Sequence, residues 1–349
     1  MSPGKNNVKK VLVLMTDKHL GNVVVSLPAI HELREFFQGS NLHLVVDNSY
    51  IEIAEAAMGP EKIVCYPRKQ VQDNPVIKRV WKFLQFARKL KGLSPDITVD
   101  LDGRQVSGLL TLISGAPLRI GAAGADWPYF YNKKVRISPG KHRVFRYLEI
   151  VSAAGAGSDS RDFQLHATDA KRTSLKHTLS GVGIKAEGPI ACIHPGAGKR
   201  FREWTSEGFS EVADWLSAKG FQVVFVGGSG DSNKINDILS LSGSKPFNLG
   251  GKLSIGELIA LLEISSLYIG NDTGPLHLAA AAGTLPVIGL FFRPGAETTW
   301  YPFTRKSMVL KGDAGCQNCK GKHCEYDFKC TRMISSEEVK QAVETLLNS

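Results

Sequence analysis

Short, almost continuously apolar runs alternate with longer segments of helical pattern along this chain. The first run, KKVLVLMT at residues 9–16, lacks the apolar–polar alternation of a half-exposed strand, so we expect a strand buried on both faces of a parallel sheet. The strands predicted in this way lie at 9–16, 41–47, 62–67, 96–103, 189–194, 222–226, 266–270 and 285–292. Strands that alternate with helices at this spacing predict an α/β fold with helices on both faces of each sheet.

The alternating pattern stops once and then restarts. Residues 155–188 are poor in apolar periodicity and rich in Gly, Ser, Asp and Lys, and a chain of 349 residues is long enough for two domains. We predict two doubly wound parallel sheets, at 1–170 and 171–334, with a cleft between them, followed by a helix at 335–349. In the first half, the segment VVVSLPAIHELREFF is expected to become helical after Pro28.

The composition is that of a globular protein, with 43% hydrophobic and 22% charged residues. No apolar run reaches the roughly 18 residues that a membrane span needs. The N-terminal run VLVLM is shorter than the core of a signal peptide. We therefore expect no export signal, no membrane span and a cytoplasmic location.

The net charge of +10 is unevenly placed: residues 1–155 hold 22 basic and 13 acidic side chains, and residues 156–349 hold 21 and 20. A one-sided positive field favours an anionic partner, although a solvated basic surface would give the same count. The chain has no RNP motif, zinc finger or basic-region heptad, so we expect no nucleic acid. The remaining partner is a phosphorylated lipid or a membrane face. The basic segment IKRVWKFLQFARKLKGL is expected either to lie on such a surface or to pack with a wet basic edge.

A glycine-containing turn followed by cations comes directly after the strand at 189–194, in the sequence IHPGAGKRFREW. Flexible glycines let a backbone approach a ligand closely, and backbone N–H groups in such a turn bind anions. Nearby cations complete what a diphosphate requires. The predicted diphosphate-binding residues are Gly196, Ala197, Gly198, Lys199, Arg200 and Arg202.

The richest segment is GNDTGPLHLAAAAG, in which Asn271, Asp272, Thr273 and Gly274 separate a strand from a helix. Asp or Thr at an N-cap and Pro at the first helical position predict a helix start here, whose free N–H groups favour a phosphate. His277 is expected in the first turn, facing the crevice. Asp231, after the strand at 222–226, is a weaker prediction as an acceptor for ribose hydroxyls, because a plain turn explains it equally well. Together these strand ends predict a nucleotide-diphosphate pocket.

Three segments, NDTGPLHLAAAAGTLPVIGLF, HPGAGKRFREWTSEGFSEVADWL and GNVVVSLPAIHELRE, resemble the ADP-heptose:lipopolysaccharide heptosyltransferases of glycosyltransferase family 9. The segment PDITVDLDGRQVSGLLTLISGAPLRIG is also similar to that family, so the resemblance covers nearly the whole chain. It implies a GT-B fold, with two Rossmann-like domains facing across a cleft, the acceptor bound by the first and the nucleotide sugar by the second. It also implies an inverting transfer that needs no cofactor, with the last helix packing back toward the N-terminal domain.

The resemblance assigns roles to individual residues. Asp272, Thr273, Gly274 and His277 would hold the heptose and diphosphate of ADP-heptose or a related nucleotide sugar. Ala197, Gly198 and a nearby cation would bind phosphate, and Leu253 would contact adenine. Arg202 stands where the family often has Lys two residues before a Trp. The acceptor would be the phosphorylated lipid A–core of lipopolysaccharide at the inner membrane surface.

The family's usual general base is the Asp of a Gly-Asp pair in the first loop, and here the pair is Gly21-Asn22. An amide is no general base at neutral pH. Three interpretations stay open: Asp17, His19 or Asp102 replaces the base; Asn22 only orients the acceptor; or the protein binds without turnover. Transfer to a protein acceptor is a further alternative to lipopolysaccharide.

Four cysteines, Cys316, Cys319, Cys324 and Cys330, form the compact pattern C-x2-C-x4-C-x5-C. Disulfides are rare in cytosolic proteins, and four thiolates at this density suit tetrahedral zinc or iron. Similar clusters occur in some members of the family that it resembles, including iron-binding heptosyltransferases that modify autotransporters. We predict a structural Zn or Fe, against the alternative of four reduced, unligated thiols.

Overall fold

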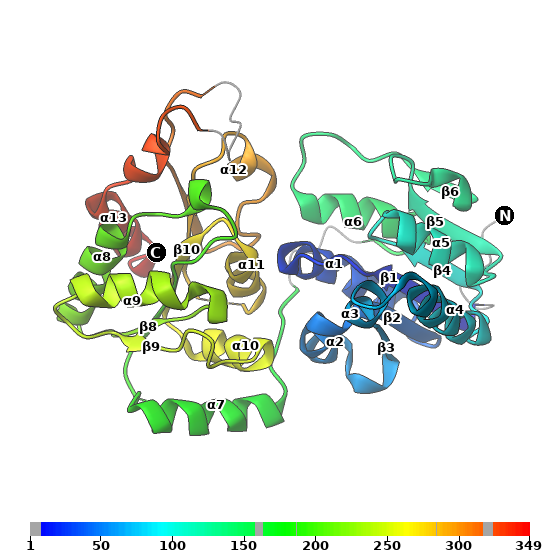
Figure 1. Cartoon of the computed structure of the whole chain (residues 1–349), viewed down its shortest axis with the longest axis horizontal. Coiled ribbons are helices and arrows are strands. Elements are labelled where there is room, and N and C mark those ends of the chain that lie inside the picture. Colours follow the sequence, from blue (N-terminus) through cyan, green and yellow to red (C-terminus); the bar gives the residue numbers. More distant parts are fainter. Residues whose placement is uncertain (1–7, 158–162, 186, 284, 317–323) are drawn as a thin grey trace. The chain divides into compact units, whose positions relative to one another are not determined.

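The computed structural model describes residues 8–157, 163–185, 187–283, 285–316 and 324–349 (Figure 1). The chain divides into two compact units, Met1–Phe163 and Gln164–Ser349. The division lies a few residues before position 170, where the sequence placed it. Each unit contains one six-stranded sheet in which all neighbouring strands are parallel.

The first unit has the strand order β3-β2-β1-β4-β5-β6. Its strands are β1 (Lys10–Met15), β2 (Asn41–Asp47), β3 (Ile63–Tyr66), β4 (Ile97–Asp100), β5 (Leu118–Ala122) and β6 (Lys133–Val135). One face is covered by α1 (Leu20–Phe36), α2 (Ile51–Met58) and α6 (Arg143–Ser152), and the other by α4 (Val76–Gly92) and α5 (Gln105–Ile113), with the short α3 (Arg68–Gln72) against α4. The continuous apolar runs are thus explained by helices on both faces.

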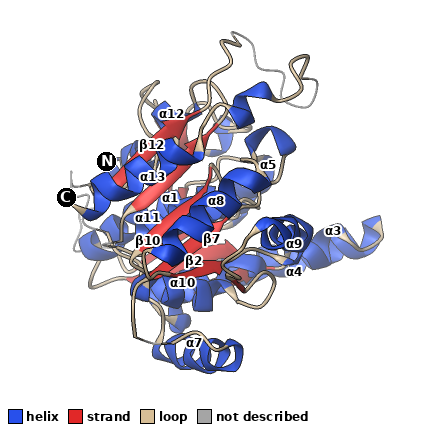
Figure 2. Cartoon of the chain, turned by 90° about the vertical axis from the view of Figure 1, so that its left-hand side faces the viewer, coloured by secondary structure: helices blue, strands red, loops and turns tan. Residues whose placement is uncertain are grey.

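The second unit has the order β12-β11-β10-β7-β8-β9, which is the same topology. Its strands are β7 (Ile190–His194), β8 (Gln222–Phe225), β9 (Phe247–Asn248), β10 (Leu267–Asn271), β11 (Val287–Phe291) and β12 (Ser307–Lys311). Its helices are α7 (Asp169–Val182), α8 (Ser206–Ala218), α9 (Ser232–Leu241), α10 (Ile255–Ile264), α11 (Gly274–Ala281), α12 (Ala296–Thr299) and α13 (Ser336–Leu347) (Figures 1 and 2). Helices α8, α9 and α13 share one face of the sheet, and α7 packs on α10 at the other.

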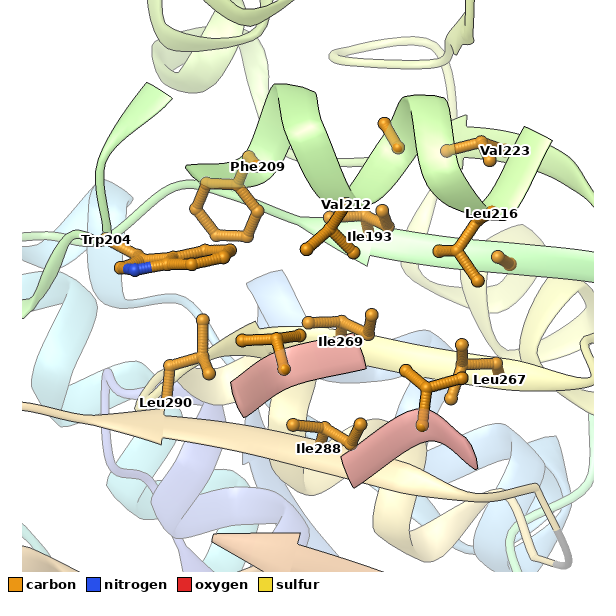
Figure 3. Close-up of a cluster of buried hydrophobic side chains, with 14 of the residues drawn as sticks. Ile193, Trp204, Phe209, Val212, Leu216, Val223, Leu267, Ile269, Ile288 and Leu290 are labelled. Carbon is orange, nitrogen blue, oxygen red and sulfur yellow. The ribbon is translucent and has the colours of Figure 1, made fainter. Parts of the chain in front are cut away.

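The core of the second unit lies under α8 (Figure 3). Phe209, Val212 and Leu216 point from this helix onto side chains of β7, β10 and β11. Trp204 lies at the end of the cluster, with its ring centroid 4.9 Å from that of Phe209 in an edge-on arrangement and its Nε1 donating to the Ile334 carbonyl at 2.9 Å. This residue ends the basic turn, so the turn is anchored directly in the core.

One expectation about helices was wrong. Helix α1 begins at Leu20, and Pro28 lies inside it. The flanking residues Leu27 and Ala29 are buried, and this packing offsets the roughly 3 kcal/mol that an internal proline costs. Helix α13 packs within the second unit, where its buried residues Val339 and Val343 belong to the core around Trp204; that residues 335–349 pack back toward the N-terminal domain stays a prediction.

Candidate active site

The strand order reverses at one point in each sheet, between β1 and β4 and between β7 and β10. Leu14 pairs with Asp100 in the first sheet and His194 with Gly270 in the second, so the loops after each pair start side by side. Ligands of doubly wound sheets bind at such switch points, outside the carboxyl ends of the strands. The predicted site residues of each unit gather around these two points.

Asn271 joins the two loops at the switch point of the second unit. Its side chain is fully buried. Its Nδ2 donates to the Pro195 carbonyl at 2.8 Å, and its Oδ1 accepts from the Trp204 backbone N–H at 3.1 Å. Asn271 therefore holds both ends of the glycine-containing turn instead of presenting its amide to a ligand.

The cations of this turn point in different directions. Arg202 donates through Nη1 to the Asp272 carbonyl at 3.4 Å, and the same nitrogen lies 3.7 Å from the Asp272 carboxylate. Lys199 is exposed, and the guanidinium of Arg200 lies 5.5 Å from the centre of the Phe328 ring. Among the contacts of the described residues, those of Arg202 are the ones that bring a cation of this turn to the residues just before α11.

Helix α11 starts at Gly274 with Thr273 as its N-cap, as the sequence predicts, but no side chain caps it. The Thr273 hydroxyl lies 3.2 Å from Nδ1 of His194 and 3.2 Å from the Asn271 carbonyl. The N-cap side chain therefore leaves the first-turn N–H groups, at the positive end of the helix dipole, available to a ligand. A helix start of this kind suits a phosphate. Burial raises the pKa of Asp272, and the charges of Arg202 and Arg293 oppose this shift.

Asp231 has one carboxylate oxygen engaged by two groups of the protein. This oxygen accepts from the Gly228 N–H at 2.8 Å and lies 3.5 Å from Nε2 of His194. The hydrogen bond with His194 is the main reason that the pKa of Asp231 is lowered. A Cβ on Gly196 would lie 2.0 Å from the same carboxylate, so this glycine is required for close approach. The arrangement supports a role for Asp231 in shaping the turn more directly than a contact with ribose.

His277 and Leu253 complete the residues predicted for the donor. His277 is buried in the first turn of α11, with its ring centroid 5.5 Å from that of Trp300. Leu253 is half-buried immediately before Ser254, whose side chain and Glu257 form the predicted capping box of α10.

Two cations near this site were missed in the sequence. Lys234, in the first turn of α9, donates to the Trp204 carbonyl at 2.9 Å, and burial lowers its pKa. Arg293 follows β11 and acts electrostatically on Asp272. The only sequence signal was a basic residue soon after a strand or glycine-rich turn.

In the first unit, Asp17 is the centre of a small hydrogen-bonded group after β1. Its Oδ1 lies 2.7 Å from Nδ1 of His19, and its Oδ2 accepts from Nδ2 of Asn22 at 2.8 Å. Asp17 is buried, whereas the His19 side chain is 61% exposed. A carboxylate on Nδ1 holds the neutral tautomer that carries its lone pair on Nε2. Asn22 thus holds Asp17, and Asp17 orients His19.

Asp102 lies across the same switch point, after β4. Its Oδ2 accepts from the Thr16 hydroxyl at 2.7 Å, and its buried Oδ1 has no hydrogen-bond partner in the described part of the chain. Burial, and then the neighbouring carboxyl of Asp100, raise the pKa of Asp102 to about 7. Asp100 is itself enclosed, accepting from the Tyr131 hydroxyl at 2.7 Å and from the Gly103 N–H at 3.0 Å. With a pKa of about 7, the Asp102 carboxyl is therefore partly protonated at neutral pH.

Two arginines of this unit were also missed. Arg68, the first residue of α3, is paired with Asp47 at 2.5 Å and also donates to the Thr16 carbonyl at the end of β1. Arg146, on α6, is close to Gly103, and its buried Nε has no partner among the described residues. Arg68 comes two residues after the end of β3, a strand-end position that the sequence could have indicated, whereas Arg146 lies within a helix.

The cysteine cluster is described only in part, because Cys319 lies outside the described residues. Cys316 and Cys324 are half-buried, Cys330 packs against the core of the second unit, and Cys324 Sγ accepts from the Phe328 N–H at 3.3 Å. Within the described ranges, no three His, Cys, Asp or Glu side chains come together in a way that could hold a metal ion. The metal prediction is unsupported by these residues. The described ranges also contain no helix with the length and apolar character of a membrane span.

Comparison with known proteins agrees with this architecture. The model of glycosyltransferase family 9 (heptosyltransferase) matches residues 83–329. Lipopolysaccharide heptosyltransferase 3 of Escherichia coli (strain K12) is 26% identical over 340 residues, which are 95% of this chain and 96% of that protein.

Solved structures show the same fold over the whole chain. A family 9 glycosyl transferase from Veillonella parvula DSM 2008 has a TM-score of 0.87 at 23% identity, covering 97% of both chains. E. coli ADP-heptose lps heptosyltransferase II has a TM-score of 0.79 at 19% identity, covering 97% of this chain and 98% of that one. The predicted GT-B fold and the resemblance seen in the motifs are confirmed. The chain belongs to glycosyltransferase family 9 and is a glycosyltransferase with the GT-B fold.

Proposed function

We propose that this enzyme transfers a heptose from ADP-heptose to the inner core of lipopolysaccharide. The observation that carries the proposal is the switch point of the second unit, where the Asn271-held turn, Arg202 and the uncapped start of α11 lie together. A diphosphate fits this combination of backbone N–H groups and a fork-shaped cation. Relatives named for heptosyl transfer to lipopolysaccharide support the sugar and the acceptor.

On the donor side, the N–H groups at the start of α11 and in the turn 196–198 bind the diphosphate, and Arg202 neutralises the charge that grows on it. Arg202 is already positioned by Asp272, so little side-chain entropy is lost when the donor binds. Lys199, Arg200 and Lys234 add positive potential from the adjoining turn. His277 and Leu253 lie within the region that holds the sugar and the base.

In the transfer step, the acceptor oxygen forms a bond to the anomeric carbon as the bond from that carbon to the diphosphate breaks. ADP leaves with the electron pair, the configuration inverts, and the hydroxyl proton passes to a base. We propose His19 Nε2 as that base, because Asp17 holds the imidazole in the accepting tautomer and the ring is accessible. Asn22 is a positioning residue that holds Asp17.

The test is an assay of the purified full chain with ADP-heptose and a series of truncated lipopolysaccharides, with the product mass measured. A gain of one heptosyl unit on a lipid acceptor supports the proposal. Product formed only on a polypeptide makes the protein acceptor the function. ADP-heptose binding without any product makes the chain a catalytically silent binder.

Single variants then locate the base. His19→Ala and Asp17→Asn are expected to lower kcat by about 10²–10⁴-fold, the usual contribution of general base catalysis. Asp102→Asn is the competing arm: if it alone abolishes transfer while His19→Ala is active, Asp102 is the base.

Asn22→Asp restores the residue usual in the family and tests further whether His19 is the base. In this chain it would put a second carboxylate about 2.8 Å from Asp17. We expect it to lower activity at neutral pH, and a gain in activity would refute the role given to His19.

A further inference from the structure

Half of helix α4 lies outside the packed body of the first unit. Residues 75–81 are all exposed, and its buried residues, Phe86, Ala87 and Leu90, belong to the second half of the helix. Figure 2 shows α3 and the start of α4 at the periphery, away from the strands. The first two turns of α4 therefore contribute little to the hydrophobic core of the first unit.

These exposed turns are apolar. Val76, Ile77, Val80, Trp81 and Leu84 are 70%, 85%, 53%, 55% and 46% exposed. Their spacing places them on one side of the helix, about a quarter turn from the side that faces the core. Five of the thirteen large hydrophobic residues exposed in the described chain are thus gathered within nine positions, which marks an interaction surface instead of scattered surface residues.

The same segment is strongly basic. Between positions 62 and 91 there are nine Lys and Arg and one acidic residue, Asp73. Within the described residues, none of the six cations of α4 takes part in an ion pair. Lys82 lies 5.6 Å from the centre of the Trp81 ring, so its charge sits at the edge of the apolar face. These cations are Lys78, Arg79, Lys82, Arg88, Lys89 and Lys91.

We propose that the exposed face of α4 is a docking surface for an anionic lipid bilayer, in which the helix lies in the plane of the interface. An apolar stripe with an interfacial tryptophan and flanking cations is what such a helix presents. A second copy of the chain fits less well, since two faces with six unpaired cations each would repel one another. The proposal rests on the proposed function only for the expectation that the acceptor is carried by a lipid.

The test measures binding of the full chain to vesicles without donor or acceptor. Vesicles of phosphatidylglycerol mixed with phosphatidylcholine should sediment the protein at low salt, and pure phosphatidylcholine should bind it far less. The double variant I77S/W81S is expected to partition at least about tenfold more weakly, because both side chains leave water on binding. K78Q/K82Q is expected to lose about fivefold per charge, with most of the loss removed by high salt.

Matched controls lie in the second unit. L241S/I264S removes two hydrophobic residues that are 52% and 50% exposed, and K176Q removes an exposed lysine from α7. These variants should bind vesicles as the unaltered chain does. Brominated lipids should quench the fluorescence of Trp81, which is the part of the signal that the Trp81→Phe variant lacks. They should not quench the other tryptophan of the first unit, Trp127.

Three results would overturn the proposal: equal binding by I77S/W81S and the unaltered chain, equal loss in the controls, or a dimer in sedimentation equilibrium that I77S/W81S dissociates. The last result would make a second copy the occupant. The vesicle assay contains no substrate, so it is independent of the transfer assay. If the chain binds vesicles but transfers no heptose, only the proposed function is refuted. If it transfers heptose to a delipidated acceptor but does not bind vesicles, only the docking proposal is refuted.

Discussion

Asn271 offers the sharpest test of how the donor side is built. In Asn271→Ala, the buried Trp204 N–H loses its acceptor and the Pro195 carbonyl loses its donor. A buried group left without a partner costs about 1–3 kcal/mol, so the second unit should lose about 2–5 kcal/mol of unfolding free energy. The affinity for ADP should also fall, because the turn that carries Arg202 is held at both ends by this side chain.

Native-state hydrogen exchange measures this loss within the second unit, using peptides from β10 and from residues 200–209 at increasing urea. Asn233→Ala, on the exposed surface of α9, is the matched control and should change the free energy by less than about 0.5 kcal/mol. If Asn271→Ala is equally harmless, the inference that Asn271 holds the turn fails.

Asn271→Asp separates the two hydrogen bonds by pH. One carboxyl oxygen still accepts from Trp204, but the other can donate to the Pro195 carbonyl only when protonated. The folded-state pKa of the new carboxyl should therefore exceed the unfolded value of about 3.9, so the variant is most stable below that pH and loses stability as pH rises through the folded pKa. Unfolding at about pH 5 and about pH 8 should show a larger deficit at the higher pH, and a deficit that shrinks at the higher pH would contradict the geometry.

Three further predictions concern other parts of the chain. Gly196→Ala forces a Cβ to 2.0 Å from the Asp231 carboxylate and should weaken ADP binding and lower the melting temperature, whereas Gly198→Ala meets no atom within 4 Å and should be tolerated; equal thermal shifts would refute this. Because the pKa of Asp102 is raised to about 7, the folded state keeps a proton that the unfolded chain releases near pH 4, so stability should fall by up to about 4 kcal/mol between about pH 4 and about pH 7, and Asp102→Asn should flatten urea midpoints measured across that range. The four cysteines stay a predicted zinc or iron site: elemental analysis of chain purified without chelator or nickel should find near-stoichiometric metal that Cys324→Ser reduces, and metal-free protein with four titratable thiols would contradict it.

The central strands were predictable because burial on both faces leaves a continuous apolar run. Of the edge strands, β3 was predicted and the other three were not: β6 has three residues and β9 two, and β12 is only half-buried. β5 was missed although it is paired on both sides, because Arg119 and Gly121 interrupt its apolar character.

The site was predictable where its residues follow strands, since parallel strands end at one edge. Arg146 reaches its site from within helix α6 through tertiary packing, and nothing in the local sequence indicates this.

The shared strand order of the two units has a consequence for how such enzymes diverge. The residues that build each core lie within strands and helices, while most residues proposed to meet substrates lie in the loops after the central strands. Exchanges in one set therefore leave the other largely untouched, and each unit can change on its own. If the first unit binds the acceptor as proposed, acceptor preference can change through residues 16–22 and 101–104 while the proposed donor side stays constant. Replacing those two segments with the segments of a relative that has another acceptor is thus a small evolutionary step. It changes far fewer residues than already differ between this chain and the relative that is 26% identical to it.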